Sequence, residues 1–218
     1  MSEEGCKRID YTWFSTCNSA CKLDVLLENK TDTNEIVALA ARLIDTLETD
    51  RFLLEICAAL QALATFKNFI VFHYSEGFSA ELIATNLDQM RLAAQMKPYT
   101  DGLYLLDPFY IANVVERRHG LLRLVDVAPE DFEASEFYLR FYAAVNVLDE
   151  IHYVVPLESS RAVHLFIERE PPSERFRDQD VARLRAVAPL ISSAVKAHWR
   201  WREGAMLCLS SRPRPCPP

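Results

Sequence analysis

The sequence predicts an α+β fold: a five-stranded, mostly antiparallel sheet flanked by helices, with a long helix at the C-terminal end. Two pairs of apolar, β-branched and aromatic runs support the sheet, 68–74 with 80–86 and 151–157 with 163–167. Each pair is joined by a few turn residues, which is typical of a β-hairpin. A further short run, 121–125, supplies the fifth strand. Segments with helical periodicity surround these runs, and such helices must cover at least one face of the sheet.

The size and composition suit one globular domain with tails. The chain has 218 residues, of which 50% are hydrophobic and 25% charged, and its formal net charge is −7. Because an acidic chain is repelled by phosphate backbones, we expect no direct nucleic-acid binding by this chain. No apolar run reaches the roughly 18 residues of a membrane span, and no basic-then-apolar leader opens the sequence. We therefore expect a cytoplasmic protein that does not contact a membrane.

Three segments are expected along the chain. Residues 1–33 form an N-terminal arm that is partly disordered, because their apolar pattern is weak. Residues 34–203 form the folded domain. Residues 204–218 form a disordered tail rich in Pro and Arg, without an apolar period.

Most helices are predicted from the spacing of their apolar residues. Apolar residues recur at intervals of three and four over 34–47 and over 53–63, and a short polar break makes these segments a helix pair. Another helix is expected over 87–96. The longest helix, 178–201, contains Pro189, and an interior proline costs about 3 kcal/mol or more unless packing offsets it.

A helix start is predicted at Asp107. An Asp directly before Pro108 is typical of an N-cap followed by the first helical position. This helix is expected to run to about His119 and to end at Gly120.

One carboxylate and several phenols gather around this helix start. Tyr99, Tyr104 and Tyr110 are close enough in sequence to donate hydrogen bonds to Asp107. A buried carboxylate needs such partners, because an unpaired one would lose its charge. Asp107 is therefore interpreted either as a helix cap alone or as a cap that also accepts a hydrogen bond from a ligand amide or amine.

An aromatic stripe follows on the next predicted helix, which opens at 129–131. Tyr138, Phe141 and Tyr142 lie on one of its faces at helical spacing. The stripe is interpreted either as core or as the lining of a ligand pocket. Two buried hydroxyls need hydrogen-bond partners, and a polar ligand or water is one source of them.

Two histidines lie on predicted strands among apolar neighbours. Alternation places His152 on the opposite face from Ile151 and Tyr153, and it places His164 on the same face as Phe166. Core or rim histidines are one interpretation, and His164 is also a candidate ligand-binding residue. Neither a metal nor another cofactor is expected, because no further ligand stands at metal-binding spacing.

Several motifs resemble the N-terminal sensory domain of LuxR-type transcriptional regulators, which has a GAF/PAS-like fold. They are Tyr104-Leu-Leu-Asp107-Pro108-Phe109-Tyr110, Val127-Ala-Pro129-Glu-Asp131-Phe132, Ser135-Glu136-Phe137-Tyr138-Leu-Arg140-Phe141-Tyr142, Arg161-Ala-Val-His164-Leu and Ala197-His198-Trp199. The resemblance covers residues 34–199. It implies that the Asp107-Pro108 corner and Tyr99 hold a small-molecule effector.

Two features depart from that family. Members that bind acyl-homoserine lactones use a tryptophan, but no tryptophan lies between Trp13 and Trp199, so the resemblance does not assign a lactone to this chain. Regulators of the family continue into a C-terminal helix-turn-helix. No second set of amphipathic helices follows Trp199, so DNA binding by this chain is not expected.

The expected function is therefore effector sensing in a LuxR-like regulator, by a chain without its own DNA-binding half. The candidate ligand-binding residues are Tyr99, Tyr104, Asp107, Tyr110, Tyr138, Phe141, Tyr142 and His164. The expected partners are an unidentified small-molecule effector and a second subunit, in a homodimer or a heterodimer with a related regulator.

Two alternatives stay open. The chain could be a ligand-free dimerisation module that modulates a full-length regulator. It could also be a GAF-type redox enzyme, for which Cys57 is the lone candidate within the domain. We expect no enzyme and no catalytic residues, because the sequence lacks G-x-S-x-G, H-E-x-x-H, C-x-x-C and phosphate-loop motifs.

Overall fold

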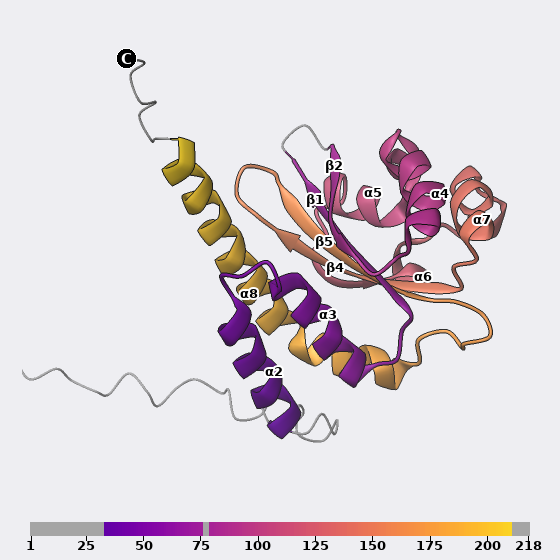
Figure 1. The fold of residues 1–218 in the computed structure, drawn as a ribbon. Coiled ribbons are helices and arrows are strands. Elements are labelled where there is room, and N and C mark those ends of the chain that lie inside the picture. Colours follow the sequence, from indigo (N-terminus) through magenta and orange to yellow (C-terminus); the bar gives the residue numbers. More distant parts are fainter. Residues whose placement is uncertain (1–32, 76–78, 211–218) are drawn as a thin grey trace, which may run out of the picture.

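One antiparallel sheet of five strands forms the centre of the molecule (Figure 1). The computed structural model describes residues 33–75 and 79–210, with side chains up to residue 203. The strands are β1 (Asn68–Tyr74), β2 (Ala80–Thr85), β3 (Gly120–Arg123), β4 (Asp149–Pro156) and β5 (Ala162–Arg169). Their order is β2-β1-β5-β4-β3. The predicted fold class is confirmed, while residues 1–32 of the predicted arm lie outside the described residues.

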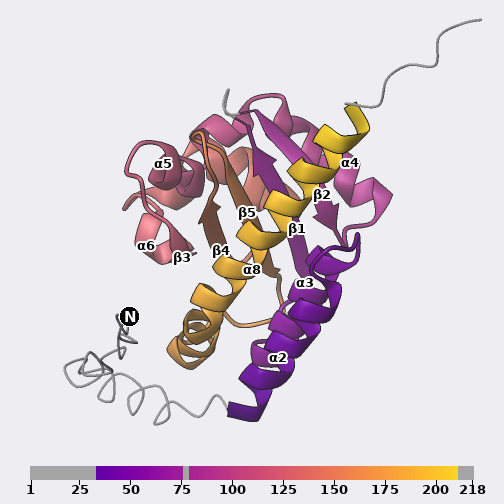
Figure 2. The ribbon, with the colours of Figure 1, turned by 90° about the vertical axis from the view of Figure 1, so that its left-hand side faces the viewer.

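Helices cover both faces of the sheet. The helices α2 (Thr33–Thr46), α3 (Phe52–Leu63) and α8 (Asp178–Ser210) lie on one face, and α8 runs diagonally across it (Figure 2). Shorter helical segments lie on the other face: α4 (Gln89–Thr100), η2 (Leu103–Leu106), α5 (Pro108–Val114), α6 (Leu124–Val127), η3 (Phe132–Ala134), η4 (Tyr138–Tyr142) and α7 (Ala143–Val145). Among the described helices, none combines the length and the apolar character that a bilayer crossing requires.

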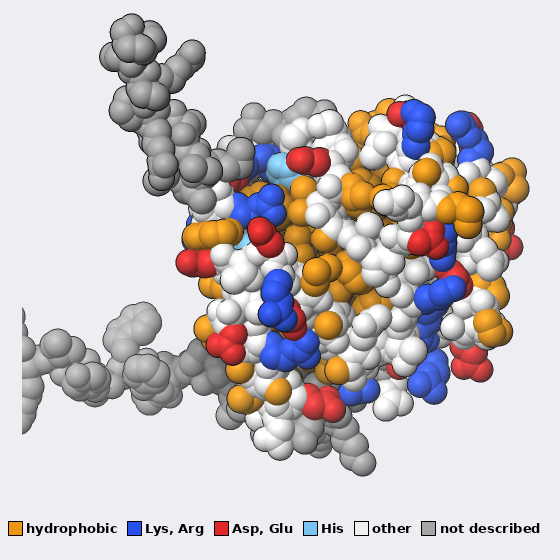
Figure 3. Space-filling view, viewed as in Figure 1, with side chains coloured by type: hydrophobic (Ala, Val, Ile, Leu, Met, Phe, Trp, Pro, Cys, Tyr) orange, Lys and Arg blue, Asp and Glu red, His pale blue; other side chains and the backbone are white. Residues whose placement is uncertain are grey.

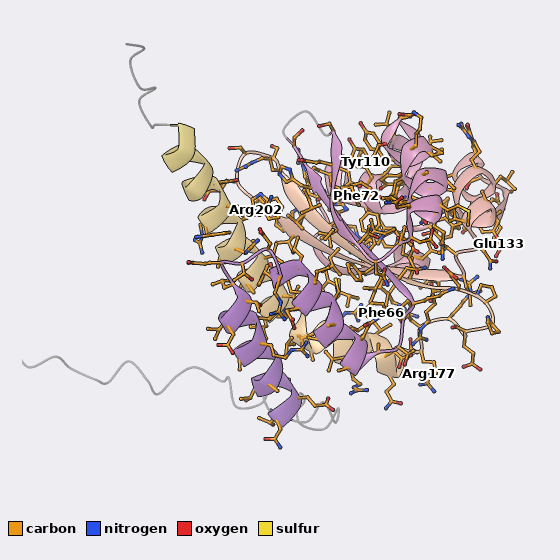
Figure 4. All side chains as sticks on the ribbon, in the orientation of Figure 1. Phe66, Phe72, Tyr110, Glu133, Arg177 and Arg202 are labelled. Atoms are coloured by element: carbon orange, nitrogen blue, oxygen red, sulfur yellow. The ribbon has the colours of Figure 1, made fainter. Side chains whose placement is uncertain are left out.

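The two faces of the sheet bury separate cores. Alternation along β4 points Ile151 and Tyr153 toward α8, while His152 points to the opposite face, as predicted. Figure 4 shows Phe66 on the α3 side of the sheet and Phe72 between the sheet and the helices of the opposite layer. Neighbouring residues of one strand therefore pack against different helical layers.

Helix α8 continues through Pro189. The proline removes the N–H that would bond the Arg185 carbonyl, and beside that gap the Tyr153 hydroxyl donates to the Leu184 carbonyl at 2.9 Å. Leu184 and Ile191, on either side of the proline, are fully buried. The helix runs to Ser210, so its predicted end near Trp201 was too early, and the first part of the predicted tail is helical.

Two predicted helix ends were also wrong. Helix α5 ends at Val114 rather than near His119, because Arg117 adopts a left-handed conformation (φ 57°) and the Arg118 N–H bonds back to the Ala112 carbonyl at 3.0 Å. Gly120, predicted as the end of this helix, instead begins β3 with φ 87°. The preceding helix, α4, extends past its predicted end to Thr100.

The helix predicted from 129–131 onward is broken into pieces. A 3₁₀ turn covers Phe132–Ala134, and the Ser135 hydroxyl then accepts the Tyr138 N–H at 3.1 Å, which starts a new helical segment. This segment winds as a π-helix, with five residues from Tyr138 to Tyr142. The wider turn lets the adjacent residues Phe141 and Tyr142 both be buried.

The Tyr153 hydroxyl gives a direct test of how α8 is held on the sheet. We expect Tyr153→Phe to lower the free energy of unfolding by about 1 kcal/mol, because the Leu184 carbonyl beside Pro189 loses its donor. Urea denaturation measures this change. Tyr138→Phe is the matched control, since the half-buried Tyr138 hydroxyl has no hydrogen-bond partner among the described residues. Equal losses in the two variants would contradict the assignment.

Candidate functional site

The face of the sheet beneath α4 and α5 buries ionisable side chains. Asp107 at the start of α5, Glu150 and His152 on β4, and His164 and Glu168 on β5 are each at most 3% exposed. Burying such groups costs free energy unless they are paired and hydrogen-bonded. Their concentration on one face makes this layer, rather than the α8 layer, the candidate site.

Asp107 is a helix cap and a hydrogen-bond hub. Its Oδ1 accepts the Phe109 N–H at 2.8 Å, as predicted for an N-cap, and its Oδ2 accepts the Tyr99 hydroxyl at 2.7 Å. The Tyr99 oxygen lies 2.8 Å from the Tyr74 hydroxyl, so the chain of hydrogen bonds reaches β1. Burial raises the pKa of Asp107 to about 6, against the effect of these hydrogen bonds.

A second group of hydrogen bonds surrounds two glutamates that face each other across β4 and β5. The Tyr142 hydroxyl donates to Glu150, whose Oε1 lies 2.8 Å from Nε2 of His152. The Gln95 amide donates to Glu168 at 3.0 Å. Burial raises the pKa of both glutamates, and it lowers the pKa of His152 to about 3, so the imidazole is neutral at pH 7.

Three buried polar atoms of this layer lack a hydrogen-bond partner among the described residues. They are Gln95 Oε1, His152 Nδ1 and His164 Nδ1. Each buried group left without a partner costs about 1–3 kcal/mol. A water or a polar ligand that offered hydrogen bonds to these atoms would reduce that cost.

The structure brings the residues of the predicted Asp107 corner together. Tyr99 supplies the expected hydrogen bond to the carboxylate. Tyr104 lies between Tyr99 and Tyr110, with ring centroids 6.1 and 5.1 Å away. Tyr110 is buried, and Figure 4 shows it between the sheet and the overlying helices.

The other four predicted residues border the same cluster. Phe141 lies 5.4 Å from the Tyr99 ring, and Tyr142 reaches Glu150. Tyr138 is half-buried at the edge and stacks on Tyr142 at 6.1 Å. His164 lies 2.9 Å from the Asn113 amide. All eight candidates therefore belong to one layer.

Aromatic rings fill the interior around this network. Phe72 lies 5.1 Å from the Tyr99 ring and 5.5 Å from the Phe166 ring. His152 is stacked between Phe109 at 3.5 Å and Phe166 at 3.7 Å. A ligand that reached Asp107 would therefore have to displace some of these rings.

Sequence reasoning missed several members of the network, namely Tyr74, Gln95, Asn113, Glu150 and Glu168. The predicted strands began at Ile151 and ended at Ile167, each one residue short of a glutamate. Alternation from His152 and Phe166 would have placed both glutamates on the inner face. Gln95 and Asn113 lie on helices and carried no comparable signal.

The possible metal ligands and the Cys57 thiol bear on the sequence expectations for metal and redox chemistry. Within residues 33–75 and 79–203, no group of three or more His, Cys, Asp and Glu side chains is arranged to hold a metal ion. Cys57 is fully buried in the core under α8, and burial raises the pKa of its thiol. A thiol that stays protonated is a poor nucleophile.

Three solved structures are similar to this chain over most of its folded part. The ligand-binding domain of VqsR from Pseudomonas aeruginosa is 27% identical, with a TM-score of 0.66 over 75% of this chain and 96% of that domain. CepR2 from Burkholderia cenocepacia, an N-acylhomoserine-lactone-dependent LuxR-family transcription factor, is 17% identical, with a TM-score of 0.57 over 78% and 98%. Escherichia coli SdiA is 13% identical, with a TM-score of 0.52 over 77% and 69%.

These likenesses confirm the resemblance to the GAF-like sensory domain of LuxR-type regulators. No protein-family model matches the sequence. No curated protein matches it either.

The buried glutamates predict a pH dependence of stability. The native state holds the proton of Glu168 up to a raised pKa of about 8, whereas in the unfolded chain the same carboxyl loses its proton above about 4.5. The contribution of this carboxyl to the free energy of unfolding is therefore highest below about pH 4.5 and falls as the pH rises toward 8. We expect Glu168→Gln to reduce the fall in unfolding free energy between about pH 5 and 8 by on the order of 1–3 kcal/mol. Chemical denaturation at each pH measures it.

Glu130→Gln, at an exposed carboxyl, is the control and should leave the pH profile unchanged. Identical profiles for wild type and Glu168→Gln would show that Glu168 is ionised in the native state and would contradict the assignment.

Proposed function

We propose that this chain is the effector-sensing domain of a LuxR-like transcriptional regulator, and that the effector binds around Asp107, Tyr99 and Tyr142. The observation that carries the proposal is the buried polar network, which leaves three polar atoms without partners beneath α4 and α5. Similarity to LuxR-family ligand-binding domains supports the same role. Catalysis is not part of the proposal.

The network favours a polar effector that exchanges hydrogen bonds with these groups. Asp107 supplies carboxylate acceptors, the protonated Glu150 and Glu168 can donate as well as accept, and Gln95 Oε1 is an acceptor without a partner among the described residues. No Lys or Arg within the described part of the chain forms a hydrogen bond with these three carboxyl groups. An amide, amine or hydroxyl held among aromatic rings would match this lining.

Binding would proceed by a shift between two packings of this layer. Because rings fill the interior, the open packing must expose some of them and is the minor state without ligand. An effector that bound only the open packing would stabilise it. Among the site residues, Tyr104 and Tyr138 are half-buried, so their side chains can move with the least loss of packing.

The expected partners belong to the proposal as well. We propose that the chain works in the cytoplasm as a homodimer or as a heterodimer with a related regulator, and that it does not itself bind nucleic acid. Apart from Pro189, the exposed positions of α8 up to residue 203 are polar, among them Arg185, Ser193, Lys196 and Arg200. Pairing through an apolar face of α8 is therefore not favoured.

A ligand-free dimerisation module is the second candidate function, and exposed apolar residues favour it. Leu105 and Leu106 on η2, Ile111 on α5 and Val115 directly after α5 are 55%, 42%, 39% and 71% exposed. Leu106 and Ile111 line a groove of about 360 Å³ with Phe132. Contiguous exposed apolar residues often mark an interaction surface. The filled interior is also what a module without a ligand would show.

Asp107→Asn tests the sensing function. Asn also serves as an N-cap through its Oδ1. Its Nδ2, in place of Oδ2, can donate to the Tyr99 oxygen while the Tyr99 hydroxyl donates to Tyr74, so we expect the melting temperature without ligand to change little. Small molecules released from protein purified out of its own host serve as the probe. They should raise the melting temperature of wild type, and Asp107→Asn should lose most of that increase. Native mass spectrometry should show the bound mass on wild type only.

Asp101→Asn is the control, since this exposed carboxylate pairs only with Lys97 on the surface. If wild type carries no small molecule, or if the probe stabilises Asp107→Asn and wild type equally, the chain does not sense an effector through Asp107.

Ile111→Ser tests the second candidate. If the apolar groove pairs subunits, this substitution should weaken the dimer about tenfold or more in sedimentation equilibrium, because it removes apolar contact area at the interface. Val37→Ser, at an exposed position on α2, is the matched control. Unchanged association of Ile111→Ser would argue against this groove as the dimer surface.

A further inference from the structure

A surface groove lies between the turn that joins β4 to β5 and the C-terminal half of α8, away from Asp107. Its volume is about 370 Å³, within the range of small-molecule sites. The residues that line it are Pro156, Leu157, Glu158, Arg161, Lys196, Trp199, Arg200 and Glu203. Figure 1 shows the β4–β5 turn reaching toward α8, and Figure 4 labels Arg202 on the adjacent part of this helix.

Cations without carboxylate partners gather at this groove, although the chain carries a net charge of −7. Most Lys and Arg side chains of the described residues form ion pairs, such as Arg42 and Arg51 with Glu55 on α2 and α3, where Figure 3 shows basic beside acidic side chains. Lys196 and Arg200 form none with the described residues and line the groove.

A smaller hollow of about 200 Å³ continues the groove around the same turn. The two hollows share Pro156, Leu157 and Arg161, and the smaller one adds Arg117 and His119. Arg117 likewise forms no ion pair with the described residues. Burial, together with the charges of Lys196 and Arg117, lowers the pKa of His119, so both cations act on this imidazole.

The acids of the groove do not neutralise these cations. Glu203 is engaged with Arg161, whose Nε also donates to the Glu158 carbonyl at 3.1 Å. This pair joins the turn to α8 and holds Arg161 in place. Glu158 is the other carboxylate of the lining, against the unpaired Lys196 and Arg200. A bound anion would therefore gain more attraction than repulsion here.

The remaining wall of the groove is apolar. Pro156, Leu157 and Trp199 form it. Trp199 also belongs to the core under α8 and is 6% exposed, with the Arg202 guanidinium 5.3 Å and the His73 ring 5.0 Å from its ring. A lining of several cations beside an apolar wall matches a small organic molecule that carries a multiply charged group. Guanidinium and ammonium groups bind phosphate oxygens through charge-assisted hydrogen bonds.

We propose that this groove binds an organic phosphate ester, with the phosphate on Lys196 and Arg200 and the organic part against Leu157 and Trp199. The site is separate from the effector site proposed around Asp107 and does not depend on it. With its phosphate on α8 and its organic part against Leu157 directly after β4, the bound ester would connect the sheet to this helix and stiffen the join between them.

Isothermal titration calorimetry on the full chain at low ionic strength tests the proposal with AMP, glucose 6-phosphate, inorganic phosphate and adenosine. We expect at least one ester to bind about tenfold or more tightly than inorganic phosphate, and adenosine to bind more weakly than AMP. The double substitution Lys196→Gln with Arg200→Gln should weaken ester binding about tenfold or more, with an unchanged melting temperature because both side chains are exposed.

Arg185→Gln is the matched control, because Arg185 is an exposed, unpaired cation of the same helix that does not line the groove. It should leave affinity unchanged within about twofold. The proposal is overturned if neither ester binds at millimolar concentration, if inorganic phosphate binds as tightly as the esters, or if Arg185→Gln weakens binding as much as the double substitution does.

Discussion

The hydrogen bond from Tyr99 to Asp107 joins the three elements that enclose the candidate site. Tyr99 lies in the last turn of α4, Asp107 caps α5, and the Tyr99 hydroxyl also meets Tyr74 on β1. The carboxylate is buried, so its desolvation must be offset by these donors and by the Phe109 N–H. The helical layer can therefore hold its polar interior only while α4 and α5 stay together over β1.

Strand alternation made much of the fold predictable from the sequence. Because side chains of a strand alternate between faces, His152 and Tyr153 had to lie on opposite sides of the sheet, and they do. The Asp107-Pro108 pair predicted its helix start for a similarly local reason, since both residues act on the first turn. Such local constraints operate in any tertiary setting.

What the sequence could not predict depends on contacts between distant segments. The π-helical turn at Tyr138–Tyr142 buries two adjacent aromatic residues, a gain that exists only once the sheet lies beneath them. The partnership of Tyr142 with Glu150 and of Gln95 with Glu168 likewise needs the tertiary fold. The candidate residues found from the sequence were Asp107, His164 and a set of aromatic side chains, whereas the two buried glutamates on β4 and β5 were missed.

The two faces of β4 connect the candidate site to α8. His152 belongs to the polar layer, and the next residue, Tyr153, donates to the Leu184 carbonyl of α8 beside Pro189. A ligand that moved β4 by parting the rings around His152 would therefore act on α8 through a single peptide unit. Parting them is costly: exposing roughly 100 Å² of ring surface costs about 2.5 kcal/mol. The contacts of a bound effector must therefore contribute more than this in binding free energy. For that reason the sensing role depends on the unsatisfied polar atoms rather than on an empty cavity.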